Sequence, residues 1–179
     1  LSMVADRLRY QPTPKRVRAD SDGTTVADST GAILVWQPGS PVPEYAFPID
    51  DVQLSRIGDL ATTVADEDLA GFVILDAAAF TWREEDDEVI GHPRDPFHRV
   101  DVVHSARRVT LRSGETVVAD SHRSEMLFET GFAGPRHYLP RGDVAVELRP
   151  SDTRTVCPYK GEATYWSAVI GDHVLTDIA

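Results

Sequence analysis

An internal repeat constrains the fold of this chain more than any other feature of its sequence. Residues 15–52 align without a gap with residues 107–144, at a constant offset of 92 positions. The run Val-Ala-Asp-Ser, for example, occurs at residues 26–29 and again at residues 118–121. Self-similarity at a fixed period indicates repeated structural units. The sequence therefore predicts an internal duplication of a unit of roughly ninety residues.

Each copy consists of short strand-forming runs separated by turn residues. These runs lie at residues 16–19, 24–28, 32–36 and 45–47, and then at residues 107–112, 115–119, 126–129, 136–139, 144–148 and 163–170. Helical periodicity is scarce: residues 59–69 suit a short acidic helix, and residues 72–79 fit either a helix or a strand. We expect a mostly β fold with little helix, in which two related small β-rich units pack about a pseudo-twofold axis.

The repeat divides the chain into four predicted segments. They are an extended N-terminal lead-in (residues 1–14), a degenerate first repeat unit (15–82), a connector (83–106) and the second repeat unit (107–179). The connector contains five consecutive acids, a pattern typical of a solvated loop. A segment rich in histidine, arginine and proline follows these acids.

Charge and composition limit the classes of partner. A net charge of −11 without a basic stripe argues against nucleic-acid binding and against an anionic membrane surface. No apolar run approaches the roughly 20 residues of a membrane span. The single cysteine excludes an internal disulfide and a four-thiolate zinc site. We therefore expect a cytoplasmic protein, while a homo-oligomer and the identity of any cofactor stay open.

The richest chemistry in the sequence lies at residues 155–161, Thr-Val-Cys-Pro-Tyr-Lys-Gly. Proline fixes φ and glycine permits a positive φ, so this segment is predicted to form a tight turn with Tyr159 and Lys160 near its tip. The first copy has no equivalent segment. A turn needed only for folding would be expected in both copies. Its presence in one copy favours a function, unless the insert at residues 59–72 fills its place in the first copy.

Two chemical roles are open for this turn. Cys157 could act as a nucleophile, since Lys160 lies three residues away and a nearby cation favours the thiolate, but no histidine follows at a recognisable spacing. A buried Cys157 would instead be an inert apolar side chain. Lys160 could bind a phosphate or carboxylate as a mobile point charge, with Tyr159 or Trp166 as the wall for a planar ligand. Asp152 is a further candidate ligand, or it caps a turn.

A second group of candidate ligands lies in the connector, at His92, Arg94, His98 and Asp101. His98 and Asp101 are three residues apart and could ligate a metal. However, Pro93 argues against a helix there, and no third ligand is identifiable, so we expect no metal site. His92, Arg94 and His98 are candidates for anion binding near the turn, or for an ion-paired clamp between the units.

Two segments of the second copy resemble the signature of a known family. They are residues 137–144 (His-Tyr-Leu-Pro-Arg-Gly-Asp-Val) and residues 150–166, which contain Pro-Ser-Asp-Thr, Cys-Pro-Tyr-Lys-Gly and Tyr-Trp. The family is a widespread group of domains of unknown function, number 427, filed under a nucleotidyltransferase-like heading. Gly142 departs from the acidic residue of that signature, and residues 82–101 resemble the connector of tandem members. The resemblance implies a small β-rich fold and no established reaction. It also implies a further strand after residue 179, so we expect the second unit to lack its last strand.

Nucleotidyl transfer itself has little support in the residues. That chemistry requires paired carboxylates that hold Mg²⁺ near the transferred phosphate. Residues 66–68 and 84–88 supply carboxylates, but not on a predicted strand beside a phosphate-binding loop. We expect the second unit to bind a small anionic metabolite in one pocket. The alternatives are a transferase- or hydrolase-like enzyme that uses Cys157 and Lys160, and a structural or interaction module.

Overall fold

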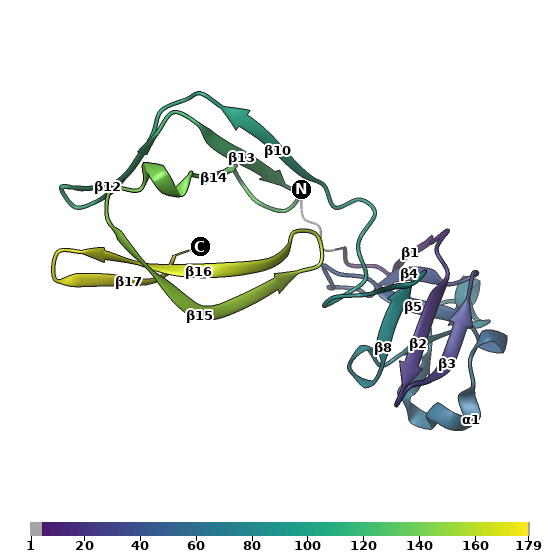
Figure 1. Cartoon of the computed structure of the whole chain (residues 1–179). Coiled ribbons are helices and arrows are strands. Elements are labelled where there is room, and N and C mark those ends of the chain that lie inside the picture. The colour runs from purple at the N-terminus through teal and green to yellow at the C-terminus, as the bar shows by residue number, and fades with distance from the viewer. Residues whose placement is uncertain (1–4, 179) are drawn as a thin grey trace. The chain divides into compact units, whose positions relative to one another are not determined.

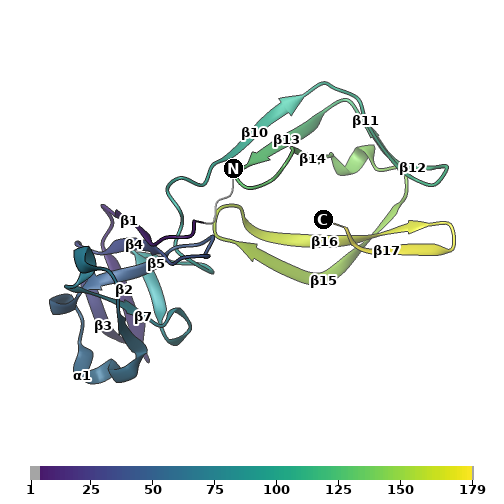
Figure 2. The same ribbon diagram turned by 180° about the vertical axis from the view of Figure 1, so that it is seen from behind.

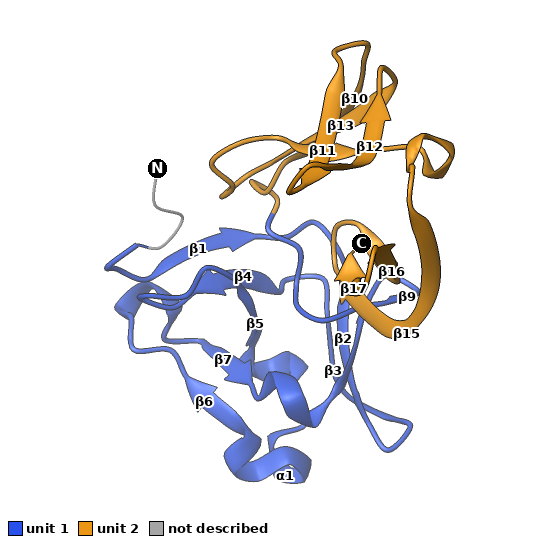
Figure 3. Cartoon of the chain, turned by 90° about the vertical axis from the view of Figure 1, so that its left-hand side faces the viewer, with its two compact units in different colours: residues 1–95 blue, residues 96–179 orange. Residues whose placement is uncertain are grey.

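The chain folds into two units, each built almost entirely from antiparallel strands. The computed structural model describes residues 5–178, and the two units comprise residues 1–95 and 96–179 (Figure 3). Strands account for 53% of the residues and helix for 11%, which confirms the predicted mostly β fold with little helix. The predicted connector, residues 83–106, divides between the two units. The pseudo-twofold packing of the units stays a prediction.

The first unit contains two sheets (Figure 1). The five-stranded sheet has the order β1-β4-β5-β7-β6 and comprises β1 (Arg9–Pro12), β4 (Ile33–Trp36), β5 (Glu44–Pro48), β6 (Ala61–Thr63) and β7 (Phe72–Leu75). The four-stranded sheet has the order β3-β2-β8-β9 and comprises β2 (Val17–Ser21), β3 (Thr24–Ser29), β8 (Thr81–Glu84) and β9 (Asp87–Glu88). β1 lies in the predicted lead-in, whose residues 1–4 are outside the described residues. β8 and β9 form a hairpin at the predicted acidic loop.

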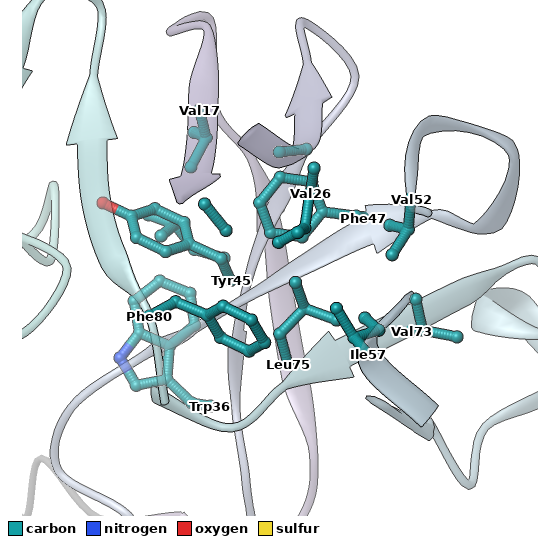
Figure 4. Close-up of a cluster of buried hydrophobic side chains, with 14 residues drawn as sticks. Val17, Val26, Trp36, Tyr45, Phe47, Val52, Ile57, Val73, Leu75 and Phe80 are labelled. Carbon is teal, nitrogen blue, oxygen red and sulfur yellow. The ribbon is translucent and has the colours of Figure 1, made fainter. Parts of the chain in front are cut away.

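The strand β4 is apolar throughout because both faces of the five-stranded sheet are covered by apolar residues. Successive side chains of a strand point to opposite faces. Leu34 therefore joins the main core cluster together with Tyr45 and Phe47, whereas Val35 joins a smaller cluster. Figure 4 shows the main cluster, in which Phe47 and Leu75 are almost completely buried.

The strand β8 supplies a large side chain to this core. β8 pairs with β2 and places the Trp82 ring against Tyr45, Phe47 and Phe80, with ring centroids 5.3, 6.0 and 6.0 Å away. The Trp82 Nε1 donates a hydrogen bond to the carbonyl of Ala77 at 3.0 Å. The core of the first unit therefore depends on a strand that lies outside the repeated sequence.

Helix is confined to single turns. Within residues 5–178 the α-helix is α1 (Leu54–Ile57), and the 3-10 turns are η1 (Ile49–Asp51), η2 (Gly58–Leu60), η3 (Glu67–Leu69), η4 (Ala77–Ala79) and η5 (Arg141–Asp143). The predicted acidic helix over residues 59–69 is wrong, because residues 61–63 form β6 and pair with β7. The ambiguous residues 72–79 form β7 and the turn η4. Across residues 5–178, no helix combines the length and the apolar character that a membrane crossing requires.

The second unit contains three small sheets. They are the three-stranded sheet β10-β13-β14, the hairpin β11-β12 and the three-stranded sheet β15-β16-β17. Their strands are β10 (Val100–Ser105), β11 (Val109–Ser113), β12 (Thr116–Ser121), β13 (Ser124–Glu129), β14 (Arg136–Tyr138), β15 (Glu147–Cys157), β16 (Gly161–Ile170) and β17 (His173–Ile178). In the opposite views of Figures 1 and 2, β15, β16 and β17 lie across the unit from β10 and β13. A buried cluster in this unit comprises only Val118, Ala168 and Ile170.

The strand pairing repeats at the same offset as the sequence. β2 pairs Val17 with Ser29 of β3, and β11 pairs Val109 with Ser121 of β12, 92 positions later on both strands. The pairs β1–β4 and β10–β13 keep the same correspondence, and so do β4–β5 and β13–β14. Two strands differ: β2 pairs with both β3 and β8 and β5 with both β4 and β7, whereas within the described residues β11 pairs only with β12 and β14 only with β13.

One hydrogen bond fixes the same corner in both units. Ser29 Oγ donates to Asp51 at 2.6 Å, and Ser121 Oγ donates to Asp143 at 2.7 Å. The second unit adds a charged partner, because Arg123 stands where the first unit has a glycine. Arg123 Nη2 lies 2.6 Å from the Asp143 carboxylate. The corner is therefore shared, and the ion pair is particular to the second unit.

Candidate functional site

The predicted turn connects the two longest strands of the second unit. β15 ends at Cys157, β16 begins at Gly161, and these two residues face each other in the hairpin. The amide of Lys160 donates to the carbonyl of Cys157 at 3.3 Å. Gly161 has a φ of 84°, a conformation that other residues disfavour. Pro158, Tyr159 and Lys160 thus form the tip of the hairpin, as the sequence predicts.

A buried carboxylate attaches this turn to the rest of the unit. Lys160 Nζ lies 2.5 Å from Oε2 of Glu129, whose side chain is only 4% exposed although it ends β13. His98 Nε2 lies 3.2 Å from Glu129 Oε1, and Arg136 Nη1 lies 3.5 Å from Oε2. We call Glu129, His98, Arg136 and Lys160 the Glu129 cluster.

The Glu129 cluster keeps its central carboxylate ionised. Burial alone would raise the pKa of Glu129, because desolvation penalises the charged form. The hydrogen bonds and charges of Lys160 and His98 outweigh this effect and hold the pKa of Glu129 below its ordinary value of 4.5. A buried charge that loses its partner is strongly destabilising. The cluster therefore fastens the turn to β13.

Aromatic rings adjoin the Glu129 cluster. Tyr159 stacks on His98, with ring centroids 4.0 Å apart and 20° between the ring planes. The Arg136 guanidinium lies 3.6 Å from the centroid of Phe132, and Lys160 Nζ lies 5.8 Å from the same centroid. The structure thus brings together three residues that the sequence singled out, His98, Tyr159 and Lys160.

The second unit also contains a cavity of about 680 Å³. Its apolar lining consists of Leu111, Val118, Ala119, Leu139, Val144, Leu148, Trp166, Leu175 and Ile178. Its polar lining consists of Arg112, Ser113, Arg136, His137, Tyr138, Arg141 and Thr164. No aspartate or glutamate of residues 5–178 lines it.

The lining of this cavity combines an aromatic wall with positive charge. The Arg141 guanidinium lies 3.9 Å from the ring centroid of Trp166, a distance suited to a cation–π contact. Three arginines in a partly enclosed apolar wall produce a positive local field, because few water molecules screen them. The volume falls within the range of about 300–1,000 Å³ that small-molecule sites occupy. Of the predicted ligand-binding residues, Trp166 lines this cavity, and Lys160 and Tyr159 do not.

Two of the three predicted connector ligands lie in the first unit. His92 and Arg94 line a cavity of about 240 Å³ together with Lys15 and several acids, among them Glu84. His92 Nδ1 lies 2.7 Å from the carbonyl oxygen of Pro93. His98 belongs to the second unit, so the three residues do not form one set within a unit.

Cys157 and Asp152 are the remaining predicted site residues of the second unit. The thiol of Cys157 is free and half-buried. Asp152 is exposed, and the turn beside it is capped by Ser151, whose Oγ accepts a hydrogen bond from the amide of Thr153 at 3.1 Å. In the described part of the chain, no group of three or more His, Cys, Asp or Glu side chains is placed to hold a metal ion.

Sequence reasoning missed the carboxylate and the arginines of these sites. Glu129 ends an apolar run, and Arg112, Arg136 and Arg141 lie among ordinary surface charges of the sequence. The available signal is the repeat itself: Glu129 stands where the first copy has Gln37. A charged residue in one copy where the other copy has a neutral one, at the end of an otherwise matched strand, indicates a local difference between the copies.

The fold and the cavity define a small β-rich domain with an apolar, arginine-containing site. The model of a family described as a domain of unknown function (DUF427) matches residues 101–179. This match covers most of the second unit and supports its membership of that family. No curated protein and no solved structure matches the chain.

Proposed function

We propose that the second unit binds a small anionic metabolite in the cavity walled by Trp166. The composition of the lining carries this proposal: it contains Arg112, Arg136 and Arg141, no carboxylate from residues 5–178, and many apolar side chains. A guanidinium matches carboxylate and phosphate groups through parallel hydrogen bonds. The second unit contains 11 acidic and 10 basic residues, so its general composition does not account for a lining with only positive charges.

Two of these arginines are the best counter-charges for a ligand. The third arginine, Arg136, already forms an ion pair with Glu129 at 3.5 Å. Arg112 donates to the backbone carbonyl of Glu115 at 3.3 Å, and Arg141 lies over Trp166. Neither Arg112 nor Arg141 pairs with a carboxylate among the described contacts. We therefore assign the anionic group of the ligand to Arg112 and Arg141, and its apolar part to Trp166.

This assignment differs in one residue from the expectation based on the sequence. Lys160 was the expected counter-charge, but its Nζ lies 2.5 Å from Glu129 and it does not line the cavity. We assign Lys160 the role of holding the turn in place. Trp166 keeps its expected role as the wall of the pocket.

We also infer that the first unit is a degenerate copy of the same family unit. The gapless alignment of residues 15–52 with residues 107–144 supports this inference, and so does the equal register of the paired strands. The shared serine–aspartate corner lies at the same offset. The arginine-lined cavity then belongs to the second of two related copies.

Calorimetry with a matched pair of ligands tests the proposed site. The probes are 1-naphthaleneacetate and 1-naphthaleneacetamide, which share a ring system and differ in charge. We expect the acid to bind at least about tenfold more tightly than the amide, the effect of one charge-assisted hydrogen bond. The variant Arg141→Gln should remove most of this preference, while Arg149→Gln should not, because Arg149 pairs with Glu147 and lies outside the cavity lining.

Two results would contradict the proposal. One is equal affinity of the wild-type chain for the acid and the amide. The other is an Arg141→Gln variant, folded by circular dichroism, that keeps the full preference for the acid.

A further inference from the structure

The first unit contains a cavity of about 310 Å³ whose lining differs in charge from the equivalent residues of the second unit. Its lining residues are Gln37, Ser40, Val42, Pro43, Glu44, Tyr45, Leu75, Ala77, Trp82, Val89, Gly91, His92 and Pro93. At the offset of 92, Gln37, Ser40 and Glu44 correspond to Glu129, Phe132 and Arg136. Those three residues of the second unit belong to the Glu129 cluster or adjoin it. These equivalent positions therefore belong to or adjoin an ion cluster in the second unit and line a cavity in the first, although Arg136 also lines the cavity of about 680 Å³ in the second unit.

We infer that this cavity of the first unit is a binding site for a small organic cation, namely an amine attached to an apolar or aromatic group. This inference does not depend on the function proposed for the second unit. The aromatic wall, the charge of the lining and the charge of the whole first unit support this inference.

The aromatic wall consists of Trp82 and Tyr45. Their ring centroids are 5.3 Å apart, and their planes are inclined by 33°. Their polar atoms have partners within the protein: Trp82 Nε1 donates to Ala77, and the Tyr45 hydroxyl donates to Glu84 at 2.8 Å. Burial, assisted by Glu84, raises the pKa of Tyr45 above its ordinary value, so the phenol stays neutral. Both rings line the cavity and carry no negative charge of their own, so they form a neutral aromatic wall of the kind that attracts a cation.

Charge in and around the lining favours a cation. Glu44 is the carboxylate of the lining, and the lining contains no lysine or arginine of the described residues. Arg94 acts on Tyr45 electrostatically, but it lines the neighbouring cavity of about 240 Å³. Glu84 is satisfied by Lys15 and Tyr45. Glu44 is thus the counter-charge that the site offers to a ligand.

The two units also differ in overall charge. Residues 1–95 contain 18 acidic and 8 basic residues, a net charge of −10, whereas residues 96–179 contain 11 and 10, a net charge of −1. A strongly negative domain raises the local concentration of cations at its surface. The field of the first unit therefore attracts the class of ligand that its aromatic cavity suits.

A pair of isosteric probes tests this inference. They are 2-phenylethylamine, which is a cation at pH 7, and 2-phenylethanol, which is neutral. In calorimetry at low salt we expect the amine to bind at least about tenfold more tightly, as expected for one cation–π contact and one ion pair. Glu44→Gln should reduce the affinity for the amine about tenfold and leave that for the alcohol unchanged. Glu67→Gln, an exposed acid outside the lining, is the matched control and should change neither.

A second variant tests the location of the site independently of charge. Ser40→Phe introduces into the first unit the residue type found at the equivalent position of the second unit. The added ring should fill the cavity and abolish binding of both probes, while Arg149→Gln, outside the lining of either cavity, should leave binding of the amine unchanged. If Ser40→Phe does not fold, Val42→Phe, at a second lining residue, takes its place. Equal affinity for amine and alcohol, or full binding by a folded cavity-filling variant, would overturn the inference.

Discussion

The two units share a pattern of strand pairing but differ in which part of each is filled. In the first unit, Trp82 packs into the core beside β2, and a cavity lies at Gln37 and Glu44. In the second unit the Glu129 cluster lies at the latter position, and a cavity is lined by β11, the equivalent of β2. Hairpin register is thus set within the repeated residues. The packing of each unit is set by segments outside the repeat, namely β8 in the first and the 155–161 turn in the second.

Several lining residues of the second cavity correspond to core residues of the first unit. Val118, Ala119 and Val144 line the cavity, and their equivalents Val26, Ala27 and Val52 belong to the buried main cluster. The same apolar surface is therefore covered by protein in one unit and available to a ligand in the other. The first-unit cluster is completed by residues from outside the repeat, namely Ile57, Val73, Leu75, Phe80 and the partly buried Trp82.

The largest expected effect is the loss of Trp82. Trp82→Ala removes a ring that contacts three aromatic side chains, and we expect the free energy of unfolding of the first unit to fall by about 3–5 kcal/mol. The measurement is urea denaturation followed by circular dichroism. Trp166→Ala is the matched control in the second unit, where we expect about 1 kcal/mol, since one side of that ring faces a cavity. Equal losses of unfolding free energy for Trp82→Ala and Trp166→Ala would show that the two rings are equally well packed.

A smaller effect is expected from Glu129. Glu129→Gln keeps the shape of the side chain but removes the charge that Lys160 and His98 bind, and we expect a loss of about 2–3 kcal/mol in the second unit. Glu125→Gln on the same strand is the control, because its side chain is 53% exposed, and a change of at most about 0.5 kcal/mol is expected.

A double-mutant cycle assigns this loss to the turn. If Lys160 mainly holds Glu129, Lys160→Ala and Glu129→Gln should be clearly less than additive in the urea midpoint. Additive losses would mean that the turn is fixed by other contacts. The difference between the two units at this position would then come from side-chain packing and not from the Glu129–Lys160 ion pair.

The smallest effect concerns the corner that both units share. Arg123 and then Ser121 lower the pKa of Asp143 from 3.8 to about 2. A pKa that is lower in the folded state stabilises the fold above the unfolded pKa, and this contribution is lost as the pH falls through the folded pKa. Arg123→Gly copies the first unit. It should lower the urea midpoint of the second unit at pH 6, and the difference from wild type should shrink between about pH 4 and pH 2.

Arg107→Gly is the control for this pH profile. Arg107 is exposed in the same unit and forms none of the ion pairs described above. Any change caused by Arg107→Gly should be independent of pH between 6 and 2. If the effect of Arg123→Gly on the urea midpoint were also independent of pH, the ion pair between Arg123 and Asp143 would not contribute a stability difference between the units.

Much of the repeated fold was predictable from the sequence, because hairpins depend on local signals. The turn dipeptides and alternating runs identify β2, β3, β11 and β12 within about two residues. The strands β1, β8 and β10 were not predicted, since polar segments form strands only when a distant partner pairs with them. The same cause explains the wrong helix at residues 59–69, where pairing with β7 outweighed a weak helical pattern.

The candidate sites were predictable only in part. Cys157 is the single cysteine of the chain, and Pro158 and Gly161 mark the turn because proline and glycine are disfavoured within strands. Glu129 was not found, since an acid at the end of a strand is ordinarily solvated and only Lys160, 31 residues later, reveals that it is buried. The expected role of Lys160 as a free cation rested on the same missing contact. Sequence patterns identify the turn, and three-dimensional contacts decide which charges remain for a ligand.

The contact between Lys160 and Glu129 has a consequence for local unfolding. It closes a loop of 31 residues and joins the tip of the β15–β16 hairpin to the end of β13. Because releasing the tip would strand a buried carboxylate, the hairpin tip and the end of β13 should open together as one cooperative segment. The backbone amides of Lys160 and Thr130 should then show matching protection factors in hydrogen exchange, although they lie 30 positions apart in the chain.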